Sequence, residues 1–226
     1  MKAHHFNDSL RMPRTGWLPD QLLAQAEPLP GSAGEAYVER RGVPVAVAVA
    51  AGLRFSRDFG GRPAVIVPLC DATDRLTSVH GRYLDVVRGQ DKMLTIGPGN
   101  GVIAVRAGWR AEPLILVEGL FDALSLATCG WPAVATIGRW AAWLPDVSAG
   151  RTVWLALDAG RPAEADVARY AQRLTHAHPR RILPPPRCKD WNTALRKCGQ
   201  AALTRWLQQH VIDDTTSDDA GNRAYE

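Results

Sequence analysis

The pattern of apolar and polar residues in the second half of the chain predicts buried strands, each followed by an amphipathic helix. Residues 114–117, Leu-Ile-Leu-Val, contain no polar position, which is typical of a strand buried on both faces of a parallel sheet. Apolar side chains then recur at helical spacing from Leu120 to Ala127. A second apolar run covers residues 153–157, and the helix expected after it keeps one face apolar. This alternation predicts an α/β fold with a mainly parallel sheet.

Three helices are predicted near the N-terminus. A short helix is expected over residues 18–26. The segment Ser-Ala-Gly-Glu at residues 32–35 is a capping box, so a second helix should run from about Ala33 to Arg41. Residues 43–51 alternate like a strand, but a proline near their start and a glycine after their end suit a helix. We therefore predict a helix there.

Short strands are predicted between these helices and the buried runs. Residues 64–69 and 76–84 are expected to pair as a hairpin. Residues 93–96 and 102–105 form short strands around the glycine-rich segment 97–101. That segment lacks the Lys-Ser/Thr ending of a phosphate-binding loop and opens no helix, so we interpret it as a hairpin turn.

Acidic residues directly follow the buried runs. Glu118 follows the first run, Gly119 permits a tight exit, and Asp122 lies one helical turn later. Asp158 follows the second run, and a third acidic segment, Lys-Asp-Trp-Asn, occupies residues 189–192. Open α/β sheets bind ligands at the carboxyl ends of their strands. Three carboxylates at the ends of successive elements therefore indicate a divalent-metal site for phosphate chemistry.

The order of these motifs resembles the Toprim domain, which is shared by bacterial replicative primases, topoisomerases of types IA and II, and small nucleases. The resemblance covers about residues 112–195 and is most specific in the segment Glu-Gly-Leu-Phe-Asp-Ala-Leu that begins at Glu118. It implies that Glu118 acts in proton transfer and that Asp158 and Asp190 hold Mg²⁺ or Mn²⁺. Asp122 is either a further metal ligand or support, or a helix N-terminal acid favoured by the helix dipole.

One position departs from the Toprim signature. The signature has an Asp-x-Asp pair, whereas this chain reads Asp158-Ala-Gly160 and lacks the second carboxylate. The loss removes a hard oxygen ligand, so either Asp190 compensates or the site is degenerate. Asn192 also stands where a carboxylate is common. Beside it, Trp191 is expected to pack in the core, the alternative being stacking on a base.

The chain before the Toprim-like segment resembles the core of bacterial and phage primases. Residues 36–55 resemble the Tyr-Leu-x-x-Arg-Gly-Ile helix pair of its N-terminal subdomain, and residues 62–85 resemble its strand, turn and Gly-Arg segment. The resemblance implies that Arg82 and Lys92 line a basic surface that meets nucleotide and template, the alternative being ordinary surface cations. Further candidates to hold phosphate are Lys189 and Arg187.

Composition narrows the class of protein. The chain has 226 residues, 46% of them hydrophobic, which suits a globular protein with a core. It has neither an apolar run long enough to span a bilayer nor the apolar centre of a secretory signal, so we expect a cytoplasmic location and no membrane partner. The four cysteines lack zinc-site spacing, and we expect no zinc. Full-length bacterial primases normally begin with a zinc-binding module.

Charge and patterning suggest four parts. We predict an N-terminal extension over residues 1–30 and a smaller, mixed α+β, primase-core-like subdomain over residues 31–110. A Toprim-like parallel sheet flanked by helices follows over residues 111–212, and residues 213–226 form an acidic disordered tail. The net charge is +4, and the tail contributes −4, so the rest of the chain carries +8. A basic body suits a polyanionic partner.

Three functions are compatible with the sequence. The favoured one is a primase-like nucleotidyltransferase of a phage or mobile element, which uses nucleoside triphosphates on single-stranded DNA and works with a helicase or another replication partner. The second is a catalytically degenerate Toprim module that only binds nucleic acid. The third is a Toprim nuclease, which the primase-like segment upstream makes the least favoured. The chain is too short for the strand-passage machinery of a topoisomerase.

Overall fold

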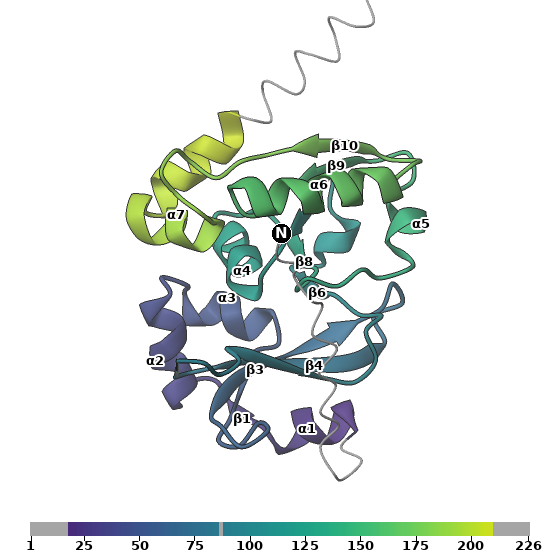
Figure 1. Cartoon of the computed structure of the whole chain (residues 1–226). Coiled ribbons are helices and arrows are strands. Elements are labelled where there is room, and N and C mark those ends of the chain that lie inside the picture. The colour runs from purple at the N-terminus through teal and green to yellow at the C-terminus, as the bar shows by residue number, and fades with distance from the viewer. Residues whose placement is uncertain (1–17, 86–87, 210–226) are drawn as a thin grey trace, which may run out of the picture.

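Two sheets lie one above the other in the computed structural model, which describes residues 18–85 and 88–209 (Figure 1). The lower sheet in that view is antiparallel, and its strands follow chain order. They are β1 (Glu27–Pro28), β2 (Arg54–Ser56), β3 (Ala64–Cys70), β4 (Leu76–Tyr83) and β5 (Met93–Ile96). The predicted hairpin of β3 and β4 is confirmed.

The upper sheet has the order β10-β9-β7-β8-β6, with four parallel strands and β6 antiparallel at one edge. Its strands are β6 (Ile103–Val105), β7 (Leu114–Val117), β8 (Ala133–Ala135), β9 (Thr152–Leu155) and β10 (His178–Arg181). All four residues of the central strand β7 are buried. The predicted α/β fold with a buried parallel strand is therefore confirmed.

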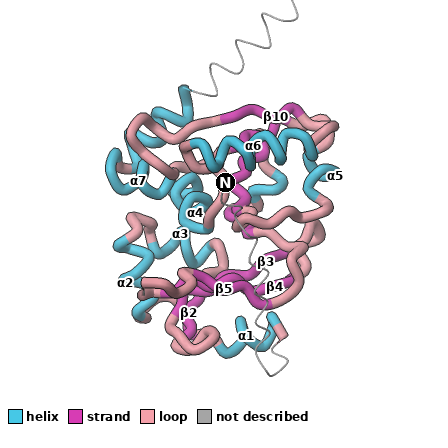
Figure 2. Tube along the Cα trace, in the orientation of Figure 1, coloured by secondary structure: helices cyan, strands magenta, loops and turns pink. Residues whose placement is uncertain are grey.

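Helices cover both sheets, as the cyan segments of Figure 2 show. They are α1 (Pro19–Gln25), α2 (Ala33–Arg40), α3 (Val45–Ala50), α4 (Leu120–Thr128), α5 (Leu144–Ser148), α6 (Arg161–Arg173) and α7 (Trp191–Cys198), with a 3-10 turn at Gly108–Arg110. Residues 200–209 are also helical. The helix predicted over residues 43–51 is confirmed as α3, and the Ser32 hydroxyl accepts a hydrogen bond from Gly34 N at the start of α2.

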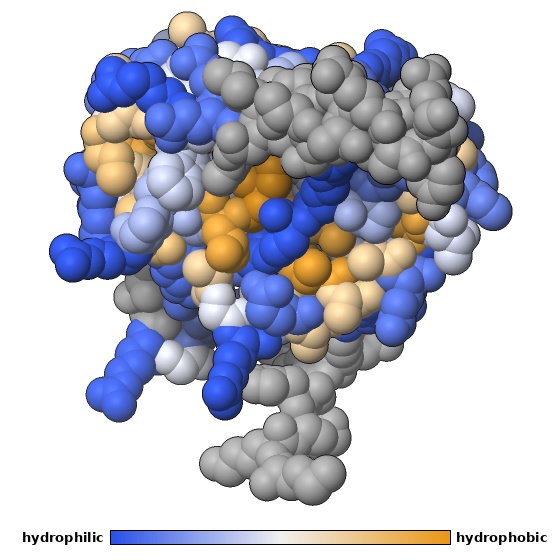
Figure 3. Space-filling model, turned by 90° about the horizontal axis from the view of Figure 1, so that it is seen from above, coloured by the Kyte–Doolittle hydropathy of each residue, from blue (hydrophilic) through white to orange (hydrophobic). Residues whose placement is uncertain are grey.

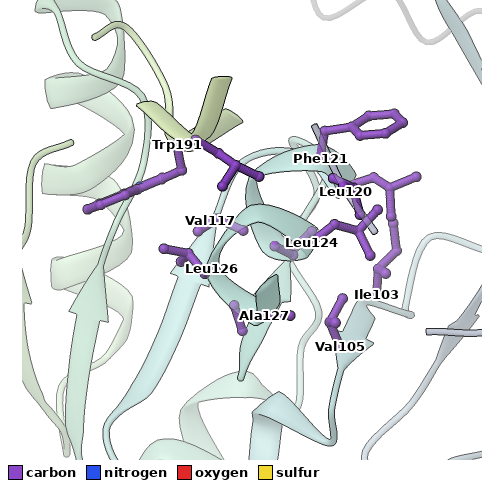
Figure 4. Close-up of a cluster of buried hydrophobic side chains, with 14 of the residues drawn as sticks. Ile103, Val105, Val117, Leu120, Phe121, Leu124, Leu126, Ala127 and Trp191 are labelled. Carbon is purple, nitrogen blue, oxygen red and sulfur yellow. The ribbon is translucent and has the colours of Figure 1, made fainter. Parts of the chain in front are cut away.

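One apolar core joins the two sheets. Val65 and Val67 of β3 belong to the same buried cluster as Ile103 of β6 and Leu124 of α4. Figure 4 shows this cluster around α4, where side chains of β6, β7 and α7 converge on the helix. The opposite face of the lower sheet is covered by α1, through Leu22. The shared core fixes how the two sheets face one another.

The glycine-rich segment 97–101 is not the hairpin turn that we predicted. It leads from β5 in the lower sheet to β6 in the upper sheet, and β6 pairs with β8 instead of β5. The reason is burial, because Ile103 and Val105 pack against α4 in the shared core. The segment is therefore a crossing between the two sheets.

Seen from above, the described surface mixes hydrophilic residues with smaller apolar areas (Figure 3). No helix within the described residues is long and apolar enough to cross a membrane. The four-part division of the chain stays a prediction, and its acidic tail, residues 213–226, lies outside the described residues.

Candidate active site

Glu118 lies at the carboxyl end of the central strand of the upper sheet. Its backbone carbonyl accepts a hydrogen bond from Ile137 N at 2.8 Å, which ties it to the loop after β8. The side chain reaches solvent, but the surrounding protein removes part of its water. This desolvation, together with the nearby negative charges of Asp158 and Asp166, raises the pKa of Glu118, and Lys189 opposes the rise. A carboxyl with a raised pKa suits proton transfer.

Asp158 and the third acidic segment come together, although they are far apart in the sequence. Ala159 N donates to Lys189 O at 2.7 Å, and Lys189 Nζ lies 3.4 Å from Asp158 Oδ2. Burial is the main cause that raises the pKa of Asp158; Asp190 adds to the rise and Lys189 opposes it. The structure thus brings Glu118, Asp158 and Asp190 to one edge of the upper sheet.

Asp190 also caps a helix. It is the N-cap residue of α7, and its Oδ1 accepts a hydrogen bond from Thr193 N at 2.6 Å. This contact fixes the carboxylate and engages one of its oxygens. The other carboxylate oxygen accepts no hydrogen bond from a described residue and is available to a further partner.

Asp122 lies inside the protein, with only 9% of its surface exposed. Its Oδ1 accepts a hydrogen bond from Asn192 N at 3.1 Å. Burial raises the pKa of Asp122 to about 7, although the Asn192 hydrogen bond lowers it. A Cβ at Gly119 would lie 2.9 Å from Asp122 Oδ2, so a larger residue there would require the Asp122 carboxylate to shift.

A basic group from the lower sheet and α2 accompanies these acids. Arg82 of β4 donates to the hydroxyl of Tyr37 at 3.4 Å. The Arg41 guanidinium lies 4.5 Å from the centre of the Phe121 ring of α4, and its Nε is buried with no hydrogen-bond partner among the described residues. Burial lowers the pKa of Arg41, as does Arg82, while Asp122 opposes the shift.

Residues 113–201 match the family described as the Toprim domain. The chain carries a Toprim domain. No curated protein matched the sequence, whereas several solved primase structures share its fold. Glu118, Asp122, Asp158 and Asp190 all lie within the matched residues.

Three of these structures extend the likeness beyond the Toprim domain. The zinc-binding and RNA polymerase domains of Aquifex aeolicus primase are 18% identical, with a TM-score of 0.65 over 84% of this chain. This chain spans 59% of the length of that one. A DnaG primase catalytic domain bound to ssDNA is 20% identical, with a TM-score of 0.63, 84% of this chain and 77% of that one being covered. The primase fragment of the bacteriophage T7 primase-helicase protein is 18% identical, with a TM-score of 0.54 and coverages of 74% and 72%. The chain therefore has the fold of a primase catalytic core.

The acidic residues at the edge of the upper sheet suit a metal ion that takes most of its ligands from water and substrate. Across residues 18–85 and 88–209, no three His, Cys, Asp or Glu side chains gather closely enough to hold a metal ion. Mg²⁺ in phosphoryl-transfer sites is commonly held by one or two carboxylates together with waters and substrate phosphates. Glu118, Asp158 and Asp190 fit this kind of donor set. Gly160, in place of the second aspartate, has φ 116° and begins α6.

Arg181 supports the Toprim site and was missed in the sequence. Its guanidinium donates to the carbonyls of Leu157 at 2.8 Å and Asp158 at 2.7 Å, and it also pairs with Glu164 at 2.8 Å. These bonds hold the backbone at the end of β9 where Asp158 begins. The only signal in the sequence was its place in a short segment just before the three prolines at residues 184–186.

Asn192 and Trp191 pack in the core of the Toprim domain. The Asn192 amide donates to Arg41 O at 2.8 Å and to Ser125 Oγ at 3.0 Å, and the residue is 2% exposed. Trp191 is fully buried and donates to Ala156 O at 2.7 Å, so it cannot stack on a base. A carboxylate at position 192 would lack both protons that these acceptors require.

Lys92 and Arg187 are not brought to the acids. Both side chains are exposed, and neither forms an ion pair with a described residue. The Arg187 carbonyl accepts from Lys197 Nζ at 3.3 Å, at the other end of α7. Arg41, which was missed, replaces them as a basic group near the site. Its signal was the Tyr-x-x-x-Arg-Gly spacing of Tyr37 and Arg41.

Proposed function

We propose that this chain is a primase-like nucleotidyltransferase, which joins nucleotides on single-stranded DNA with Mg²⁺ or Mn²⁺. The observation that carries the proposal is the pairing of an acidic Toprim edge with a basic group, Arg41 and Arg82, from a second sheet joined to it by one core. A nuclease needs the acids but has no evident need for that second unit. The primase-core fold of the chain supports the same choice.

Each group of residues has a distinct part in this proposal. Glu118, whose pKa is raised, transfers a proton at the reacting hydroxyl. Asp158 and Asp190 hold the metal ion, which when bound supplies positive charge against the phosphates. Asp122 and Asn192 support these ligands from inside the protein. Arg41 and Arg82 bind phosphate oxygens, with Lys189 as a further phosphate contact.

The partners follow from the same reasoning. One structural relative is a primase catalytic domain bound to ssDNA, and another is a fragment of a phage primase-helicase. We propose single-stranded DNA and nucleoside triphosphates as ligands of this chain, and a helicase or another replication protein as its partner. An origin in a phage or mobile element and a cytoplasmic location belong to the same proposal.

The test is template-directed incorporation of labelled ribonucleotides on single-stranded DNA, with Mg²⁺ and with Mn²⁺. The wild type should make short products, and Glu118→Gln should lose them by roughly 100-fold or more, because a general acid or base contributes about that factor. Retained DNA binding by Glu118→Gln would show that the loss is chemical. Absence of products from the wild type, alone and with a helicase, would overturn the proposal.

A second candidate is a nucleic-acid-binding module without catalysis. Two observations favour it. Position 160 is a glycine, which supplies no carboxylate. The Lys189 ammonium forms an ion pair with Asp158 and so competes with a metal ion for that carboxylate. This candidate predicts salt-dependent binding of single-stranded DNA without products, unchanged by Glu118→Gln. Cleavage of DNA or RNA with Mn²⁺ would instead point to a Toprim nuclease.

A further inference from the structure

The crossing segment 97–101 is docked against the loop that follows β8 in the Toprim domain, residues 136–143. Asn100 Oδ1 accepts a hydrogen bond from Ala142 N at 3.1 Å. Asn100 O accepts from the indole of Trp143 at 2.9 Å. The two segments come from different sheets, so these bonds form a fixed junction between them.

Arg139 lies in this junction and is half-buried. Its guanidinium has no hydrogen bond or ion pair to a described residue. Gly99 and the His80 ring lie near it. Arg139 Nη1 would lie 3.5 Å from a Cβ at Gly99. His80 of β4 is buried, and burial, with Arg139 and Arg82 nearby, lowers the pKa of His80 to about 4. No acid is among the groups that shift the pKa of Arg139.

A half-buried cation without an acceptor is costly, because desolvation is not offset by attraction. Burial accordingly lowers the pKa of Arg139. An anion that entered the junction would meet one fork of guanidinium donors and no competing carboxylate. Arginine suits phosphate in particular, since its planar donors can bind two phosphate oxygens at once.

The backbone that carries Arg139 is tied to Glu118. Ile137 N donates to Glu118 O at 2.8 Å, and Arg139 N donates to Thr136 O at 2.9 Å. The Tyr170 hydroxyl donates to Thr136 Oγ1 at 3.1 Å and lies 3.4 Å from Arg139 O. Ile137 has φ 48°, a strained value for a β-branched residue that the surrounding bonds enforce. The turn that carries Arg139 is therefore fixed, through its backbone, to the strand end that carries Glu118.

We propose that Arg139 is a phosphate-binding residue, which receives a phosphate group of the substrate where segments 97–101 and 136–143 meet. The inference rests on the proposed function for the identity of the substrate. Two sources share this chemistry, the backbone of a single DNA strand and the triphosphate of a nucleotide. In either case Arg139 binds the phosphate by its charge and by paired hydrogen bonds, and it makes no contact with the acids of the upper sheet.

The test measures binding, so that it is independent of catalysis. Arg139→Gln is compared with wild type and with Arg75→Gln, which removes the same charge from an exposed turn. One arm titrates a labelled oligo-dT strand at several salt concentrations. The other arm titrates ATP and inorganic tripolyphosphate by calorimetry. A lack of primer synthesis by the wild type would then affect the proposed function alone.

We expect Arg139→Gln to weaken one of the two ligands about tenfold, as the loss of a charged hydrogen-bonding partner does. If the strand is the ligand, the slope of log affinity against log salt should also fall by about 0.7. If the triphosphate is the ligand, tripolyphosphate and ATP should weaken together. Equal affinities for both ligands in Arg139→Gln and Arg75→Gln would overturn the proposal.

A second measurement covers a failure of the variant to fold. The melting temperature of the wild type should rise at constant ionic strength with whichever of tripolyphosphate and oligo-dT is the ligand, and that of folded Arg139→Met should rise less. Arg139→Met should by itself melt at or above the wild-type temperature, because it removes an unpaired half-buried charge. A melting temperature of the wild type that changes with neither tripolyphosphate nor oligo-dT would overturn the proposal without any variant.

Discussion

The acidic edge and the basic group of the site are built in different ways. Glu118, Asp158 and Asp190 each follow a strand or cap a helix, so the backbone places them. Arg41 and Arg82 come from a helix end and a strand of the other sheet, and reach the site with long side chains. The acids repel one another, and the buried Nε of Arg41 has no hydrogen-bond partner among the described residues, so each side is incomplete alone. The acidic edge and the basic group together suit a ligand that carries both a metal ion and phosphate groups.

The largest expected effect on the acidic edge comes from a change at Asn192, the buried residue that supports it. Asn192→Asp should lower the free energy of unfolding by about 3 kcal/mol, because it buries a charge and leaves the Arg41 carbonyl and Ser125 hydroxyl without their donor. Urea unfolding followed by circular dichroism measures the change. Asn100→Asp is the matched control, since this exposed residue only accepts through its side chain and should change stability little. Equal stability of the two variants would contradict the anchoring role.

The pH dependence of stability probes the same anchor. The folded pKa of Asp122 is about 7, above its ordinary value of 3.8. Between these values the folded protein binds the proton and the unfolded chain does not, so stability should fall as the pH rises, at about 1.4 kcal/mol per pH unit, and level off above the folded pKa. Asp122→Asn, which keeps an acceptor for Asn192 N, should flatten this part of the curve. Parallel curves for variant and wild type would show that Asp122 is ionised throughout.

The sequence predicted the acidic side because its signals are local. The run before Glu118, the glycine after it and the apolar spacing of α4 lie within a few residues of one another. The β5–β6 hairpin was wrong because strand pairing is set by distant partners, here β8. Arg41, Arg139 and Arg181 escaped notice for a related reason. From sequence alone, an arginine is taken for a surface cation, and only the fold shows which residues surround it.

The salt dependence of single-stranded DNA binding tests the role of the basic group. Arg82→Gln should weaken single-stranded DNA binding a few-fold and lower the slope of log affinity against log salt by about 0.7, as expected for one lost phosphate contact. Lys92→Gln removes an equal charge from an exposed residue that the structure leaves away from the acids. Its effect on the slope should be smaller. Equal slopes for the two variants would show that general charge, and not the position of Arg82, governs binding.

The smallest expected effect is on metal affinity and comes from the ion pair between Lys189 and Asp158. Lys189 pairs with Asp158 at 3.4 Å while 74% of its side chain is exposed. Lys189→Met should raise Mn²⁺ affinity about threefold, because a competing cation is removed at a solvent-screened site. Titration of Mn²⁺ by electron paramagnetic resonance measures this, with Lys197→Met as control. A fall in Mn²⁺ affinity would mean that Lys189 orders Asp158 for the metal ion instead of competing with it.

The backbone at Gly160 determines what a second carboxylate at this position would cost. With φ 116° and ψ 162°, this residue occupies a region open to glycine and strained for any residue with a Cβ. Space is not the obstacle, since the nearest atom to an added Cβ is 3.9 Å away. Gly160→Asp would therefore add a carboxylate at a backbone cost of about 1–3 kcal/mol, unless the turn before α6 also changed its conformation.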